Sequence, residues 1–162
     1  MSGIATTDLK RKFMMMIAED EITFKTIDNK DAQYPDDLFG TKTCPQSIFP
    51  QIKIDFTEQE AGTYIGIKID YPSICKNELY KDYILTIMII SNNAHLKSPN
   101  GSNRTDIIAE SLIRLFNWNS AIGFSLELVS DVEDPLDTKH YFRKLRFKSL
   151  TSNSITNGVK QN

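Results

Sequence analysis

The run from Tyr83 to Ile90 constrains the fold of this chain more than any other stretch. Successive side chains of a strand point to opposite faces. Neither alternate set is polar here: one is Tyr83, Leu85, Ile87 and Ile89, and the other is Ile84, Thr86, Met88 and Ile90. A strand that is apolar on both faces has to be covered on both. We therefore expect it at the centre of a sheet, with a helix or a second layer on each side.

The composition fits one globular α+β domain. The chain has 162 residues, of which 40% are apolar and 25% are charged, and its formal net charge is −2. This length suits a single domain, which we place at residues 1–150. Residues 151–162 are rich in Ser, Thr and Asn and are expected to form a disordered tail. The negative charge argues against a surface that binds nucleic acid all over, but it allows a local basic stripe.

Hydrophobic spacing predicts two helices. One begins near Asp8, and a stronger one covers residues 105–118. Apolar residues recur in both at intervals of three and four, which is the helical period. The two faces consist of Leu9, Phe13, Met16 and Ile17 in the first helix, and of Ile108, Leu112, Leu115 and Phe116 in the second. Both helices are expected to pack on the central strand.

Alternation and β-branched residues predict a mixed or mostly antiparallel sheet. Proline cannot donate to a strand ladder, so Tyr71-Pro72 should end the strand that contains it. That strand and the one before it are expected to form a hairpin. The predicted strands cover residues 22–27, 52–56, 65–71, 83–90, 122–128 and 140–150.

A long segment from Asp28 to Pro50 is rich in Asp, Asn, Pro and Gly and reads as a loop. It far exceeds the usual connection of about 4–6 residues, and such loops tend to be functional. Its apolar residues suggest that it packs on another surface. We assign a contact with a second copy of the chain to Tyr34, Leu38, Phe39, Ile48 and Phe49.

Charges are segregated near the end of the chain. An acidic loop at 130–139 is followed by a basic strand, in which alternation separates Arg143 from the other cations. Three interpretations stay open: a solubilising edge strand, an ion-paired contact with the acidic loop of another subunit, or binding to a nucleic-acid backbone. Our subunit-contact assignment covers Asp131, Glu133, Asp134, Asp137, Arg143, Lys144, Arg146 and Lys148.

No motif in the sequence indicates chemistry. His95, His140, Cys44 and Cys75 lack the spacing of a zinc site. The chain contains no phosphate-binding glycine motif, and the acidic loop does not match an EF-hand. We therefore expect no cofactor, no metal and no enzymatic activity. A small enzyme that uses Cys75 or His140 is the remaining alternative.

The order of elements resembles that of small tailed-bacteriophage neck proteins, namely tail terminators (tail-completion proteins) and head–tail connectors. The stretches that carry this resemblance are 104–116, 124–128 and 141–147. The resemblance implies a structural virion protein that forms a six- or twelve-fold ring between capsid portal and tail. It further implies contacts with other neck, portal or tail proteins, possible transient contact with DNA, no membrane association, and assembly in the host cytoplasm.

Overall fold

The structure, a computed structural model, describes residues 6–52, 62–74, 81–119 and 125–150. Its centre is a five-stranded sheet of order β1-β2-β3-β5-β4. The strands are β1 (Ile48–Phe49), β2 (Thr63–Ile74), β3 (Lys81–Asn92), β4 (Ser125–Pro135) and β5 (His140–Leu150). Only β1 and β2 pair in parallel, and the other neighbours are antiparallel. The mixed sheet with helices confirms the predicted α+β class.

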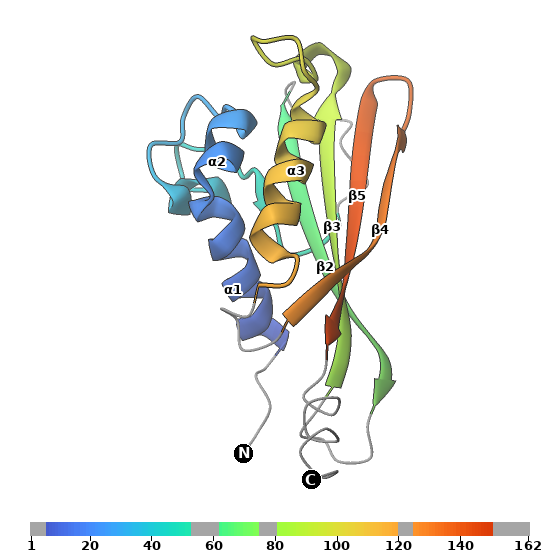
Figure 1. The fold of residues 1–162 in the computed structure, drawn as a ribbon. Coiled ribbons are helices and arrows are strands. Elements are labelled where there is room, and N and C mark those ends of the chain that lie inside the picture. The colour runs from blue at the N-terminus through green and yellow to red at the C-terminus, as the bar shows by residue number, and fades with distance from the viewer. Residues whose placement is uncertain (1–5, 53–61, 75–80, 120–124, 151–162) are drawn as a thin grey trace, which may run out of the picture.

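The described α-helices all lie on one face of the sheet (Figure 1). They are α1 (Thr6–Glu19), α2 (Glu21–Ile27) and α3 (Arg104–Phe116), and two short 3-10 helices, η1 (Pro35–Phe39) and η2 (Asn93–His95), sit in the connections. The apolar spacing explains the packing, because Leu9, Phe13 and Ile17 of α1 are all buried. Both predicted helices are therefore confirmed.

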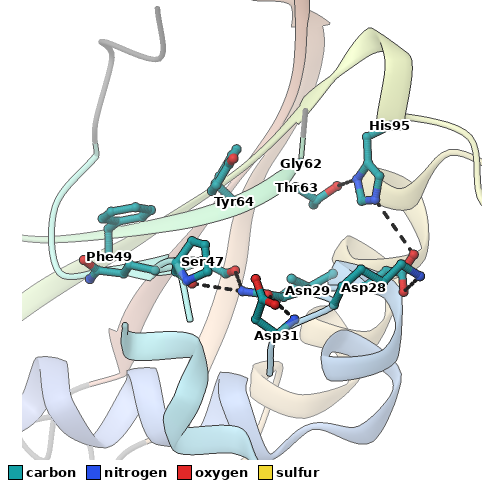
Figure 2. Close-up of a pocket in the computed structure, with 13 residues that line it drawn as sticks. Asp28, Asn29, Asp31, Ser47, Phe49, Gly62, Thr63, Tyr64 and His95 are labelled. Carbon is teal, nitrogen blue, oxygen red and sulfur yellow. Dashed lines mark hydrogen bonds and ion pairs between the residues drawn. The ribbon is translucent and has the colours of Figure 1, made fainter. Parts of the chain in front are cut away.

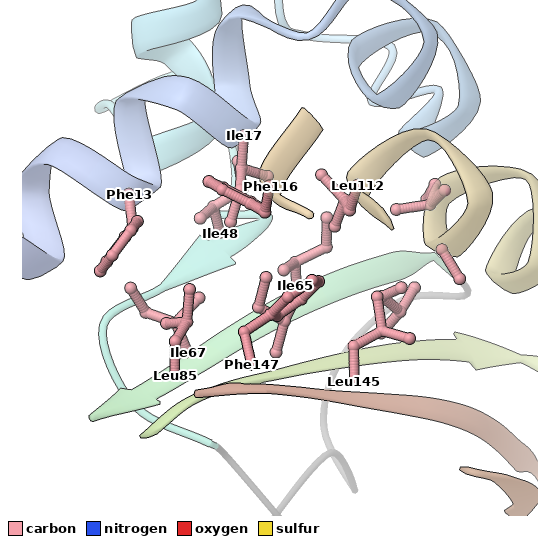
Figure 3. Close-up of a cluster of buried hydrophobic side chains, with 14 of the residues drawn as sticks. Phe13, Ile17, Ile48, Ile65, Ile67, Leu85, Leu112, Phe116, Leu145 and Phe147 are labelled. Carbon is pink, nitrogen blue, oxygen red and sulfur yellow. The ribbon is translucent and has the colours of Figure 1, made fainter. Parts of the chain in front are cut away.

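Strand β3 occupies the middle of the sheet, as predicted. Its helix-facing side chains join the main core, in which Phe116 contacts Phe13 and Phe147 at ring-centroid distances of 5.7 and 5.8 Å (Figure 3). Edge-to-face packing of this kind adds to the free energy gained from burial. Leu85 and Leu145 are fully buried in the same cluster.

The other face of the sheet departs from the prediction, because no described helix covers it (Figure 1). Met88 and Ile90 are nevertheless buried there, in a second cluster that includes Ile52. The chain after β1 passes close to this cluster: a Cβ atom on Gly66 would lie 2.7 Å from the carbonyl oxygen of Gln51. A glycine at position 66 thus lets the backbone approach the sheet.

Residues 22–27, predicted as a strand, form the helix α2. The preceding residue, Asp20, caps it: Oδ2 accepts from the Thr23 backbone N–H at 3.0 Å and from the Thr23 hydroxyl at 2.6 Å. A salt bridge of 2.6 Å joins Glu21 and Lys25 one turn apart. A cap and an i,i+4 pair outweigh the strand preference of the β-branched residues.

Two further boundaries differ from prediction. Strand β2 continues past Pro72 to Ile74, with a register shift between Asp70 and Ser73 that accommodates the proline. Strand β4 continues through Pro135, so most of the predicted acidic loop is strand. Three predicted segments lie largely or wholly outside the described residues. They are the strand 52–56 that opens the predicted hairpin, the start of the predicted strand 122–128, and the predicted tail 151–162.

Candidate functional site

A polar pocket of about 440 Å³ opens where the segment after α2 meets β1 and the start of β2 (Figure 2). Its volume lies within the range of small-molecule sites. Asp28 and Asp31 line one side, and Thr63, Tyr64 and His95 line another. Asp28 ends α2 in a left-handed conformation with φ of 54°, which turns the chain into this pocket.

Hydrogen bonds already engage most polar groups of the pocket. His95 Nδ1 lies 2.9 Å from Thr63 Oγ1, which is also 2.9 Å from Ser91 Oγ. The Asn29 amide donates to the Pro45 carbonyl and to Ser47 Oγ, both at 2.9 Å. Because these groups satisfy one another, the pocket joins α2, η2, β2 and β3 rather than offering a set of open ligands.

The trio Thr63, His95 and Asp28 does not form a nucleophilic relay. Such a relay needs hydrogen bonds at both nitrogens of the imidazole. Here His95 Nε2 is 4.0 Å from Asp28 Oδ2, and Thr63 is only 2% exposed. Burial, with the nearby Arg104 charge, lowers the pKa of His95. The ring is therefore neutral at pH 7, as suits a partly buried hydrogen-bonding group.

Arg104 forms a clamp beside the pocket. It is 7% exposed, and its Nη1 donates to the Thr26 carbonyl at 2.8 Å, at the end of α2. Its Nη2 lies 3.6 Å from Asp28 Oδ2. A cation at the carboxyl end of a helix is favourable, because the last carbonyls lack partners within the helix. Arg104 thus ties the start of α3 to the end of α2.

The anchors of the 28–50 segment are divided between core and surface. Leu38, Ile48 and Phe49 are at most 4% exposed within this single chain. Phe39 packs partly against the same core, and Tyr34 is 67% exposed. The segment folds back on its own chain, so burial of Leu38, Ile48 and Phe49 requires no second copy.

Charged strands β4 and β5 form an antiparallel hairpin. Arg143 binds Asp131 through two hydrogen bonds of 2.8 and 2.7 Å and reaches Asp106 of α3 at 3.0 Å. These bonds, those to Asp131 above all, raise the pKa of the guanidinium above its ordinary value despite its partial burial. The acidic and basic sets therefore meet within one chain, at least through this network.

The remaining predicted residues of the hairpin form no ion pair with Arg143, although Glu133 lies opposite it in the strand register. Glu133 and Asp134 are exposed on β4. Asp137 lies in the turn, where it accepts from the backbone N–H of Lys139 at 2.7 Å and contacts the His140 ring at 3.0 Å. The bond from Lys139, followed by the contacts with His140, lowers the pKa of Asp137. Lys144, Arg146 and Lys148 face away from the helices, as alternation predicts.

Two potential chemical groups are accounted for by structure. His140 is 8% exposed and held by Asp137. Cys44 is 2% exposed, and burial raises the pKa of its thiol, so it is not an activated nucleophile. Within the described ranges, no group of three or more His, Cys, Asp or Glu side chains could hold a metal ion. Cys75 lies outside those ranges.

A family model described as YomW matches residues 13–149 of the chain. The chain belongs to the YomW family. The family name derives from a Bacillus phage, which is compatible with a phage protein and agrees with the resemblance at that coarser level. No curated protein and no solved structure matches the chain. The matched range includes the pocket, the clamp and the charged hairpin of this YomW protein.

Sequence reasoning missed the most exposed apolar side chain of the β4 edge, Trp118. It is 61% exposed and has a φ of 61°. The backbone N–H of Trp118 donates to the Leu126 carbonyl at 2.7 Å, which fixes this residue beside the first residues of β4. The Asn117-Trp118-Asn119 sequence indicated a helix end, and nothing local distinguished an exposed tryptophan from a buried one.

In this member of the YomW family, no described helix is long and apolar enough to span a membrane.

Proposed function

We propose that this YomW protein is a structural subunit of phage assembly: a neck or tail-terminator-like ring component that joins capsid portal to tail. The phage-derived family supports the setting. The proposed role needs no reactive centre, and the hydrogen-bonded pocket and buried Cys44 thiol are consistent with that. In this proposal the protein acts by holding neighbouring copies and adjoining virion proteins in register.

Trp118 is the observation that carries the proposal. A non-glycine residue in the left-handed region costs about 1–2 kcal/mol. Here the hydrogen bond to Leu126 holds that conformation and leaves the indole largely in solvent. Tryptophan is enriched among the residues that dominate protein interfaces, because a large ring loses little side-chain entropy on burial. Strained backbone that presents such a ring fits a docking residue.

The edge of β4 extends this candidate contact surface. Val129 and Val132 are 50% and 45% exposed, and no described strand pairs with the outer side of β4. The register shift at 128–130, the carboxylates of β4 and Pro135 all disfavour indiscriminate edge-to-edge pairing. Contact through side chains with a different surface of the next copy would be heterologous, and such contacts form a ring when the rotation between copies closes.

The native mass of the purified full chain at micromolar concentration tests the proposal. Wild type should give a discrete ring stoichiometry by light scattering. Trp118→Ala should weaken association at least about 30-fold, which corresponds to the 2 kcal/mol or more of an interface hot spot. Ile22→Ala, at a 42% exposed apolar residue on α2, is the matched control and should leave the mass unchanged.

A wild-type chain that remains monomeric, or a Trp118→Ala ring as stable as wild type, contradicts the proposal. Tyr34→Ala forms a separate arm, because Tyr34 is the exposed aromatic of the 28–50 segment. Loss of assembly in Tyr34→Ala alone moves the contact from the β4 edge to that segment. Thermal unfolding of each variant separates loss of contact from loss of fold.

A further inference from the structure

The face of the sheet opposite the helices gathers basic side chains from strand β5. The register places Lys144 beside Met88, Arg146 beside Thr86 and Lys148 beside Ile84 of β3. These three cations, called here the basic stripe, alternate with Arg143, Leu145 and Phe147, which point toward the helices. Lys148 is exposed, and Lys144 and Arg146 are half-buried.

The basic stripe is not neutralised by the described part of the chain. Arg143, on the opposite face, forms salt bridges with both Asp131 and Asp106. None of the three stripe residues forms an ion pair with a described carboxylate. Glu127 pairs in register with Lys148 without a salt bridge, and Lys68 on β2 is engaged by Asp70 at 3.3 Å. The three stripe cations are therefore left without an ion-pair partner among the described residues, although Glu127 and Asp134 lie on the same face of the sheet.

Spacing and neighbours favour phosphate as the counter-charge. Alternate residues of a strand lie about 6.8 Å apart, so the three cations span about 14 Å and can reach several phosphates of one DNA strand, whose axial rise is about 3.4 Å per nucleotide. The hydroxyl of Ser130 lies in the same cross-strand row as Arg146. Hydroxyl and cationic side chains are the usual donors to phosphate oxygens. Met88, which lies beside Lys144 on β3, is only 8% exposed, whereas Val132, which lies beside Lys144 on β4, is 45% exposed.

We propose that the basic stripe binds the phosphate backbone of duplex DNA without reading its sequence. Between Lys144 and Lys148, the stripe's face of β5 carries no aromatic side chain, because Phe147 points toward the helices, so a single-strand stacking platform is disfavoured. The proposed contact lies along the sheet face of β5 and is made to the phosphate backbone, not to the base edges inside a groove. The stripe and the proposed ring contact share no residue, and although Val132 of the ring contact lies beside Lys144, each proposal is tested with its own variants.

The test measures binding of the full chain to a 30-base-pair duplex of mixed sequence by fluorescence anisotropy. Wild type should bind at 50 mM salt and weaken steeply by 200 mM. Three phosphate contacts contribute a slope of about −2.7 in log K against log salt, or about 40-fold over this range. The triple variant Lys144→Gln, Arg146→Gln, Lys148→Gln should lose that part of the slope and bind at least tenfold more weakly at 50 mM.

The matched control removes the same charges elsewhere. Arg11→Gln, Lys12→Gln and Lys42→Gln change one arginine and two lysines, all exposed and away from the sheet. This control should keep the wild-type salt slope. Where the stripe triple variant does not fold, as judged by its thermal transition, the single variant Arg146→Gln is used instead. It should make the salt slope shallower by about 0.9.

Three results overturn the inference. One is the absence of binding by wild type at 50 mM salt. Another is an equal loss of affinity in both triple variants, which reports net charge alone. The last is unchanged DNA binding with an altered native mass in the stripe variant, which assigns the stripe to an acidic surface of a second copy. Failure of the Trp118 experiment leaves DNA binding by a monomer measurable, so the two proposals fail separately.

Discussion

Replacing Arg104 with methionine tests whether the clamp between α2 and α3 stabilises the fold. Methionine keeps a long apolar side chain, so packing of the stem is largely retained. What is lost is the charged hydrogen bond to the Thr26 carbonyl at 2.8 Å and the ion pair with Asp28 at 3.6 Å. Both interactions join α3 to the end of α2, two elements that are distant in sequence.

The geometry sets the size of the expected effect. A hydrogen bond from a charged donor contributes about 1.5–3 kcal/mol. The ion pair adds little, since the Asp28 side chain is 34% exposed and also binds Lys30 at 2.7 Å. Arg104 Nε is buried with no hydrogen-bond partner among the described residues, so its removal recovers part of the loss. The free energy of unfolding should fall by about 2 kcal/mol, toward the low end of that range.

Thermal and urea unfolding measure this effect. For a domain of this size, a loss of about 2 kcal/mol corresponds to a Tm lower by about 4–8 °C. Arg114→Met, at an exposed arginine on the same helix, is the control and should stay within about 0.5 kcal/mol of wild type. An Arg104→Met protein as stable as the Arg114→Met protein would refute the clamp.

Two other perturbations have defined outcomes. Gly66→Ala places a Cβ 2.7 Å from the Gln51 carbonyl oxygen, and urea unfolding should show a loss of about 1–3 kcal/mol from this overpacking; no loss would mean that residues 51–52 do not lie against β2. His95 has a lowered pKa through burial and the Arg104 charge, so the unfolded chain binds a proton there first as pH falls below the ordinary value of 6.5. Stability should therefore decline between pH 6.5 and the lower folded pKa, and His95→Gln should flatten this decline in Tm measured at pH 7.5 and 5.5; an unaltered pH profile contradicts the assignment.

Elements with one dominant pattern were predictable from the sequence. Strand β3 is apolar on both faces, which predicted its central place in the sheet. Helix α3 repeats its apolar residues at helical spacing, which predicted its buried face. The alternation in β5 also separated Arg143 from the basic stripe. The strand patterns are reliable because a shift of the strand register by one residue would turn the core side chains to the opposite face of the sheet.

Prediction failed where two local preferences competed. Residues 22–27 contain β-branched side chains typical of strands, yet the single residue Asp20 caps a helix there and also accepts from the Ser111 hydroxyl of α3 at 2.6 Å. The carboxylates after Leu128 read as a loop, because acidic residues are poor strand formers. Asp131 is stabilised in the strand by Arg143, a partner that only the hairpin brings near.

The clamp and the exposed tryptophan could not be predicted from the sequence for a different reason. Asp28, His95 and Arg104 come from three separate segments, and no spacing rule links them. Trp118 depends on a hydrogen bond to Leu126, across residues 120–124 that the structure does not describe. Such sites arise from tertiary contacts, whereas the sequence patterns report secondary structure.

The order of strands divides the sheet into two ribbons of unequal origin. Strands β2 and β3 are consecutive in the chain, as are β4 and β5, but the seam between β3 and β5 joins residues as distant in sequence as Ile84 and Lys148. Closing that seam costs more chain entropy than closing either ribbon, with an increase of about 0.6 kcal/mol for each doubling of the loop length. The molecule should therefore assemble by docking two preformed halves, with α3 travelling between them as the tether that both halves must bury.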